Sequence, residues 1–134
     1  MPVINFSFTN ISGERRPFTS GGTTVKNAVV MKDITKTKVS FGPQSQDVLR
    51  ITFEFTSDYE PNHGNITFRG EVLYLDKPEK LDALAKSWQK DKKMPKDEGR
   101  EIGNHVLGRC NVEAILLSRE LGLPSPIELP RLGK

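Results

Sequence analysis

The chain has 134 residues, of which 35% are hydrophobic, and 20 basic against 17 acidic side chains leave a net charge of +3. That length suits one domain whose core needs no disulfide or metal, and a lone cysteine excludes an internal disulfide. The small, dispersed charge excess argues against a dedicated nucleic-acid binder, and no run approaches the roughly 20 apolar residues of a membrane span. With no leader pattern, we expect a cytoplasmic protein without membrane insertion.

Apolar and polar side chains alternate in four stretches of the first 75 residues, a pattern typical of half-buried strands. Strands are predicted over 3–9, 25–41, 48–57 and 65–75, joined by a loop over 13–24, a turn over 42–47 and a connection over 58–64. The alternation slips near Met31–Asp33, which predicts a bulge or turn. Gly70 lies in the inward-facing row of the last strand, which predicts a kink or the close approach of another backbone.

The spacing of apolar residues then changes to that of helices. Asp76 and Pro78 are typical of a helix start, and a first helix is predicted over 77–92. A second, long helix is predicted over 95–121, before Gly122. Its stripe is formed by Ile102, Val106, Cys110, Ala114, Leu117 and Leu121.

The proline-containing tail over 123–134 cannot be helical and is predicted to be an extended, polyproline-like arm. The fold class is therefore α+β. We expect one domain over 1–134 in which a four-stranded, or slightly larger, antiparallel sheet over 3–75 precedes the two helices.

No group of side chains indicates catalysis or metal binding. His63, His105 and Cys110 are three candidate ligands without motif spacing, whereas structural zinc normally takes four. His105 and Cys110 are five residues apart on one helix, about 140° around its axis, so the two side chains should not meet. We predict a protein that is not an enzyme and has no catalytic residues, no cofactor and no metal.

The carboxylates on the strands have a simpler explanation than acid–base chemistry. Glu54 and Glu71 lie on adjacent strands, and Arg50 and Arg69 are on the same predicted face. Cross-strand ion pairs are therefore expected.

Apolar side chains exceed what one small sheet can cover. Leu73 and Leu75, the long second helix and the Leu/Pro/Ile tail all contribute to the excess. Unmatched apolar surface of this kind indicates an oligomer or a binding surface.

Three segments follow one another in a distinctive order: FEFTSDYEPNHGNITFRGEVLYL (53–75), the helix that ends near Trp88, and GNHVLGRCNVEAILLSRELGLPSPIELPR (103–131). Through these segments, residues 47–132 resemble the archaeal branch of the SecB-like chaperone family. The order of parts is similar to that of bacterial SecB, with Gly70-Glu71-Val72 and the Leu-Pro-x-Pro-Ile-x-Leu-Pro tail matching the family pattern.

The resemblance implies a homo-oligomeric chaperone for protein transport. Such a protein holds unfolded or precursor polypeptides in apolar grooves, without nucleotide or metal. Candidate client or subunit contacts are Tyr74, Trp88, Leu123 and Ile127. Bacterial SecB is strongly acidic and this chain is basic, so docking to the translocation ATPase is not implied.

Two alternatives remain open at this point. A nucleic-acid-binding module would use Phe6, Phe8, Arg15, Arg16 and the lysines of the second strand, although these lack an aromatic-basic signature. A structural subunit would bind one specific protein partner.

Overall fold

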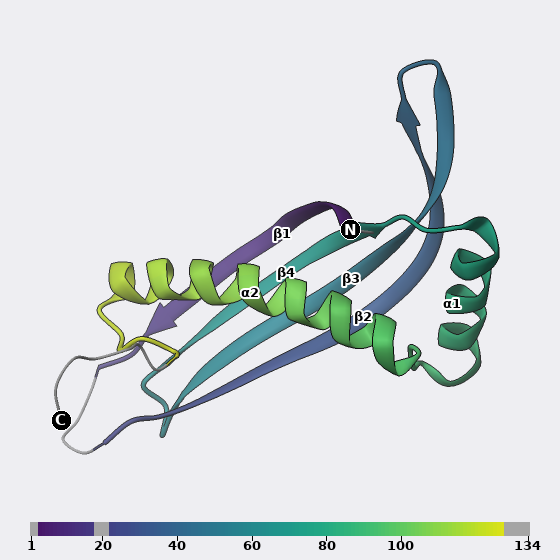
Figure 1. Ribbon diagram of the computed structural model, residues 1–134. Coiled ribbons are helices and arrows are strands. Elements are labelled where there is room, and N and C mark those ends of the chain that lie inside the picture. The colour runs from purple at the N-terminus through teal and green to yellow at the C-terminus, as the bar shows by residue number, and fades with distance from the viewer. Residues whose placement is uncertain (1–2, 18–21, 128–134) are drawn as a thin grey trace, which may run out of the picture.

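The computed structural model describes residues 3–17 and 22–127 and shows a sheet followed by two helices (Figure 1). Its elements are β1 (Val3–Arg15), β2 (Thr24–Phe41), β3 (Gln44–Glu60), β4 (Gly64–Tyr74), α1 (Pro78–Asp91) and α2 (Lys96–Leu121). The strands form one sheet in the order β1-β4-β3-β2, and every neighbouring pair is antiparallel. The predicted fold class is confirmed, including the long second helix.

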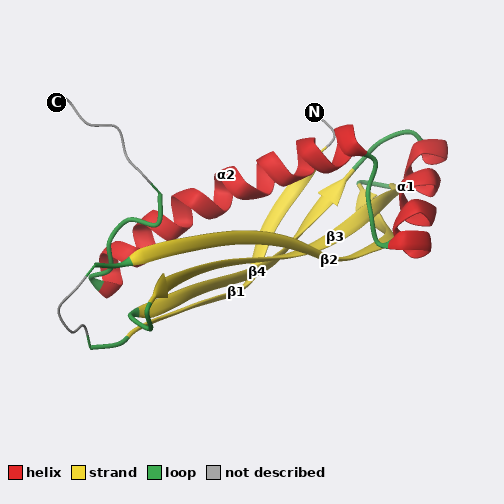
Figure 2. Cartoon of the chain, turned by 90° about the horizontal axis from the view of Figure 1, so that it is seen from below, coloured by secondary structure: helices red, strands yellow, loops and turns green. Residues whose placement is uncertain are grey.

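Figure 2 shows α2 crossing one face of the sheet and α1 standing at one end of it, and within the described residues no helix covers the other face. The inward rows of β3 and β4 fill the layer between sheet and α2 because their side chains alternate along each strand. Among the most buried side chains are those of Phe53, Phe55, Phe68, Val72 and Ile102, each at most 1% exposed.

β1 is longer than the sequence pattern indicated. We predicted a strand over 3–9 and a loop from Gly13, but the strand continues to Arg15, which is paired with Gly64. A Cβ added at Gly13 would lie 2.8 Å from Leu121 Cδ1, so this glycine makes room for α2 instead of forming a turn. Residues 18–21 of the predicted loop lie outside the described residues.

The β2–β3 hairpin turns more tightly than predicted. Only Gly42 and Pro43 form the turn, because Gly42 adopts a φ of 63° that glycine takes readily, and β3 begins at Gln44. The bulge predicted near Met31–Asp33 is confirmed by a register shift between those two residues. Figure 1 shows this hairpin extending beyond the rest of the sheet, next to α1.

Gly70 allows three segments to pack at one point. A Cβ there would collide with the backbone oxygen of Ser7 and lie 2.7 Å from Cζ of Phe53. The predicted close approach of another backbone is confirmed, and it brings the β1 edge against β4.

Ion pairs connect α1 to the rest of the chain. Lys36 Nζ of β2 lies 2.7 Å from an Asp82 carboxylate oxygen, and Lys80 Nζ lies 2.7 Å from a Glu98 oxygen of α2. Asp76, predicted as a helix cap, accepts a hydrogen bond from the Lys77 backbone N–H at 2.8 Å. The helix-capping position itself is Lys77, which makes no side-chain cap bond.

Candidate polypeptide-binding surface

Apolar side chains on α2 point away from the sheet. Ala114 and Ser118 are buried, whereas Val112 and Leu116 are 60% and 49% exposed. Residues two positions from Ala114 are about 200° away around a helix, so Val112 and Leu116 lie on the side opposite the sheet. We call these two residues the outer face of α2.

The β1 edge adds further apolar surface. Ile4 and Ile11 are 38% and 47% exposed, and within the described residues β1 pairs only with β4. Phe6 stacks on Phe53 with ring centroids 5.2 Å apart, and the Arg109 guanidinium carbon lies 4.6 Å from the Phe6 ring centroid. The Phe6 ring therefore connects the β1 edge to α2.

A hollow of about 340 Å³ lies between α2 and β2. It is lined by Asn27, Ala28, Val29, Leu107, Asn111 and Ile127, and we call it the α2–β2 hollow. Leu107 is 38% exposed there. The Asn111 Oδ1 atom is buried and has no hydrogen-bond partner among the described residues. The hollow therefore combines apolar side chains with the amide side chains of Asn27 and Asn111.

Residues 123–127, which we call the C-terminal strap, cross to the sheet after α2 ends. Gly122 ends the helix with a φ of 69°, and the Leu123 N–H donates to the Ser118 carbonyl oxygen at 2.8 Å. The Leu123 side chain is 6% exposed and belongs to the core. The extended tail predicted from its prolines is thus held against the body of the protein up to Ile127, and residues 128–134 lie outside the described part.

Two side chains of the sheet hold the strap by its backbone. The Tyr59 hydroxyl of β3 donates to the Pro124 carbonyl oxygen at 2.6 Å, and Asn27 Nδ2 of β2 donates to the Pro126 carbonyl oxygen at 2.8 Å. The Ser57 hydroxyl donates to Asn27 Oδ1 at 2.6 Å. Ser57 therefore orients the Asn27 amide so that its nitrogen faces the strap.

The four predicted contact residues are not brought together. Tyr74, Trp88 and Leu123 are buried, at 1%, 6% and 6% exposed, so a partner would reach them only if the packing around them opened. Ile127 is half-buried and lines the α2–β2 hollow. That any of the four contacts a client or a subunit stays a prediction.

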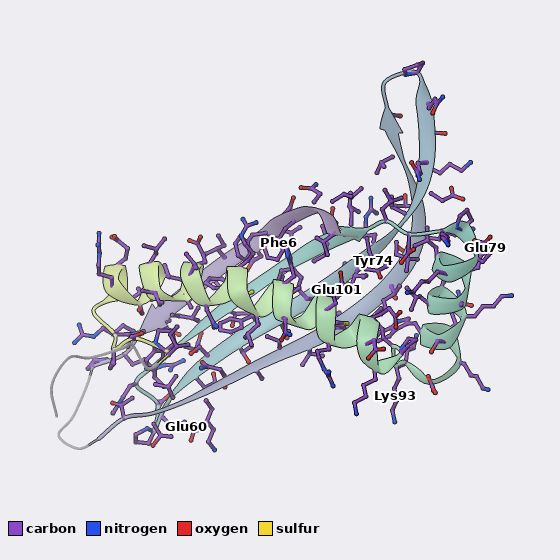
Figure 3. All side chains as sticks on the ribbon, in the orientation of Figure 1. Phe6, Glu60, Tyr74, Glu79, Lys93 and Glu101 are labelled. Atoms are coloured by element: carbon purple, nitrogen blue, oxygen red, sulfur yellow. The ribbon has the colours of Figure 1, made fainter. Side chains whose placement is uncertain are left out.

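Tyr74 lies at the α1 end of the sheet, and Glu60 lies at the opposite end (Figure 3). Burial, the nearby carboxylates of Asp76 and Glu101 and the hydrogen bond to Asp76 raise the pKa of Tyr74 to about 12. This environment keeps the Tyr74 hydroxyl protonated, as expected for a core residue.

Exposed apolar residues on α2 were missed by reading the sequence alone. Leu107, Val112 and Leu116 fall outside the apolar stripe, from Ile102 to Leu121, that predicted the buried face. They are the apolar residues of the predicted helix that do not belong to the stripe, so listing those residues would have identified them.

The cysteine and carboxylates that were considered as candidates for catalysis have structural roles. Burial raises the pKa of the Cys110 thiol to about 12, so it is a poor nucleophile. Arg69 Nε lies 2.8 Å from a Glu54 oxygen, and Arg50 Nε lies 3.5 Å from a Glu71 oxygen, which confirms the cross-strand ion pairs. Within residues 3–17 and 22–127, no group of His, Cys, Asp and Glu is placed to hold a metal ion.

Comparison with known proteins gives one structural similarity to report. No family model and no curated protein matches the chain. It is similar to the Mycobacterium tuberculosis SecB-like chaperone Rv1957, solved in complex with a ChAD peptide from the Rv1956 HigA1 antitoxin. The TM-score is 0.49 at 13% identity, covering 98% of this chain and 90% of that chain.

Neither helix in the described residues is long and apolar enough to cross a membrane.

Proposed function

We propose that the protein is a holdase chaperone, which binds non-native or precursor polypeptides through apolar surface without catalysis or a cofactor. The observation that supports this is the set of large apolar side chains that the folded subunit leaves open. Among the described residues, six are 38–60% exposed: Ile4, Ile11, Val30, Leu107, Val112 and Leu116. Each Å² of such surface that a partner covers contributes about 25 cal/mol. Exposed apolar area is therefore a source of affinity that needs no specific sequence in the client.

Two parts of this surface suit different partners. The outer face of α2 is a convex ridge beside the β1 edge, and it suits a second copy of the chain in a homo-oligomer. The α2–β2 hollow is concave and offers both apolar walls and amide groups, which suits an extended polypeptide. Following the archaeal SecB-like resemblance, we propose that the clients are precursors held in the cytoplasm for transport.

The holdase proposal predicts suppression of aggregation at stoichiometric ratio. A chemically denatured client diluted into buffer should scatter less light when the protein is present. Leu107→Asp places a charge in the hollow and should weaken this protection several-fold. Gln89→Asp is the matched control, because Gln89 is exposed on α1 and lies away from the hollow. Unprotected aggregation with the unaltered protein would reject the proposal.

The rival functions give different outcomes in simple binding assays. A pull-down that returns one stoichiometric partner, and not many clients, would favour a structural subunit. For the nucleic-acid module, Phe6 and Phe8 do not form an open platform, because both rings pack against Phe53 on the helix-covered face. We therefore expect no shift with single-stranded DNA or RNA even at low salt.

A further inference from the structure

The surface under the C-terminal strap is built to recognise a polypeptide backbone. Its two hydrogen bonds go to carbonyl oxygens of the strap at alternate residues, Pro124 and Pro126, and not to side chains. The donors come from neighbouring strands, Tyr59 of β3 and Asn27 of β2. Carbonyl oxygens occur in every residue, so these contacts set the conformation of the bound chain and place little demand on its side chains.

The chemistry of this surface favours a chain that contains proline. Proline has a carbonyl oxygen but no N–H, so a proline-containing segment offers acceptors and few donors. The surface supplies donors, and the Asn27 oxygen already accepts the Ser57 hydroxyl. One of the two acceptor positions of that oxygen is therefore already used. Prolines also hold an extended conformation before binding, which lowers the entropy lost on binding.

Apolar pockets complete the recognition of the strap. Leu123 and Pro126 are buried, and Ile127 ends in the α2–β2 hollow beside Leu107. The pattern that the surface accommodates is thus an apolar residue, a spaced pair of prolines and a second apolar residue.

We propose that the surface under the strap is a binding site for extended, proline-containing segments of other polypeptides, and that residues 123–127 occupy it as an internal competitor. This inference rests on the proposed polypeptide-binding function and names the class of segment bound. A client segment binds the site only after the strap has left it. A ligand must therefore bind more tightly than the strap does, and weak ligands do not displace the strap.

The test weakens the strap without touching the site. In the full chain, Pro124→Gly combined with Pro126→Gly keeps both carbonyl oxygens but makes the free strap more flexible, which favours its release. The probe is a fluorescein-labelled peptide with the sequence of residues 121–127. By fluorescence anisotropy, we expect this strap variant to bind the peptide at least about 10-fold more tightly than the unaltered protein.

Site variants show whether the gain comes from the proposed contacts. Tyr59→Phe, which removes one hydroxyl, and Asn27→Ala should each reverse most of the gain when added to the strap variant. A peptide with both prolines replaced by alanine should bind more weakly than the probe. Circular dichroism and urea unfolding establish that each variant is folded.

Three results would overturn the inference. The first is equal binding of the probe by the strap variant and the unaltered protein, and the second is a gain that Tyr59→Phe does not reduce. The third is a fall in the native mass of the strap variant without probe binding, which would assign the site to exchange of tails between copies. Suppression of client aggregation is measured separately, so loss of the proposed holdase function and loss of this inference are distinguishable.

Discussion

At the scale of single residues, two glycines show how the cost of one methyl group depends on the atoms it meets. At Gly13 a Cβ would press on the ends of the Leu121 and Leu117 side chains, which can move. At Gly70 it would press on the Ser7 backbone oxygen and the Phe53 ring, which are fixed by the sheet and the core. The same substitution therefore has different consequences on β1 and β4.

We expect Gly70→Ala to lower the free energy of unfolding by about 2–3 kcal/mol, because overpacking here must shift backbone. Gly13→Ala is the matched control, and it should change the free energy of unfolding by less than about 1 kcal/mol. Urea titrations followed by circular dichroism measure both values. Equal effects would show that the β1–β4 contact at Gly70 is less close than described.

Tyr74 gives a prediction about alkaline pH. Its pKa is raised from 10.0 to about 12, so folding favours the protonated hydroxyl. The resulting stabilisation is complete below pH 10 and is lost as the pH rises toward 12. Tyr74→Phe should therefore lose less stability than the unaltered protein between pH 10 and 12, as measured by urea unfolding at each pH. Part of the decline should persist in the variant, because burial also raises the pKa values of Cys110 and Tyr59.

At the scale of elements, α1 contacts its neighbours partly through charges at the surface. Lys80 Nζ lies 2.7 Å from Glu98, and the side chains are 44% and 15% exposed. The hydrogen bond from Lys80 is the largest cause of the lowered pKa of Glu98. Solvent screening limits what such a pair contributes to holding α1 against α2.

A double-mutant cycle of Lys80→Ala and Glu98→Ala should give only a small coupling free energy at neutral pH, because solvent screens the exposed lysine. Because the pKa of Glu98 is lowered by folding, the coupling should vanish as the pH falls below the ordinary range of a glutamate and Glu98 is protonated. Thermal unfolding of the four proteins over a series of decreasing pH values from pH 7 provides the measurement. Coupling that does not decrease at any acidic pH would contradict a mainly ionic interaction.

At the scale of the whole molecule, exposed apolar groups lie on two sides of α2. The outer face is proposed to contact a second copy, while the α2–β2 hollow and the strap lie toward β2 and are proposed for clients. This arrangement leaves the client surface open after self-association. The two surfaces can therefore be tested by different substitutions.

Val112→Glu with Leu116→Glu should reduce the native mass measured by light scattering to that of a monomer. Burial of one such side chain contributes about 1.5–3 kcal/mol, and a two-fold interface counts each substitution twice, so dissociation should increase by at least about 100-fold. Gln89→Glu on α1 adds a charge without changing either surface, and its mass should remain that of the unaltered protein. A monomer before any substitution would reject the homo-oligomer proposal.

The sequence by itself determined the order of strands and helices and the faces they bury. Alternation in 48–57 and 65–75 predicted the inward rows of β3 and β4, and the stripe from Ile102 to Ala114 predicted the buried side of α2, because these patterns follow from local geometry. Gly70 was also identified correctly, since a glycine in a buried row needs a neighbouring segment to explain it.

Only the tertiary structure decided what the surplus apolar residues and the tail do. Gly13 was predicted to begin a loop, but it lies beside Leu121, more than 100 positions later in the sequence, and no local pattern encodes that contact. The α2–β2 hollow needs β2, α2 and Ile127 to meet. The strap site depends on Tyr59, Asn27 and Ser57, whose hydrogen bonds exist only once two strands and the end of the chain are adjacent.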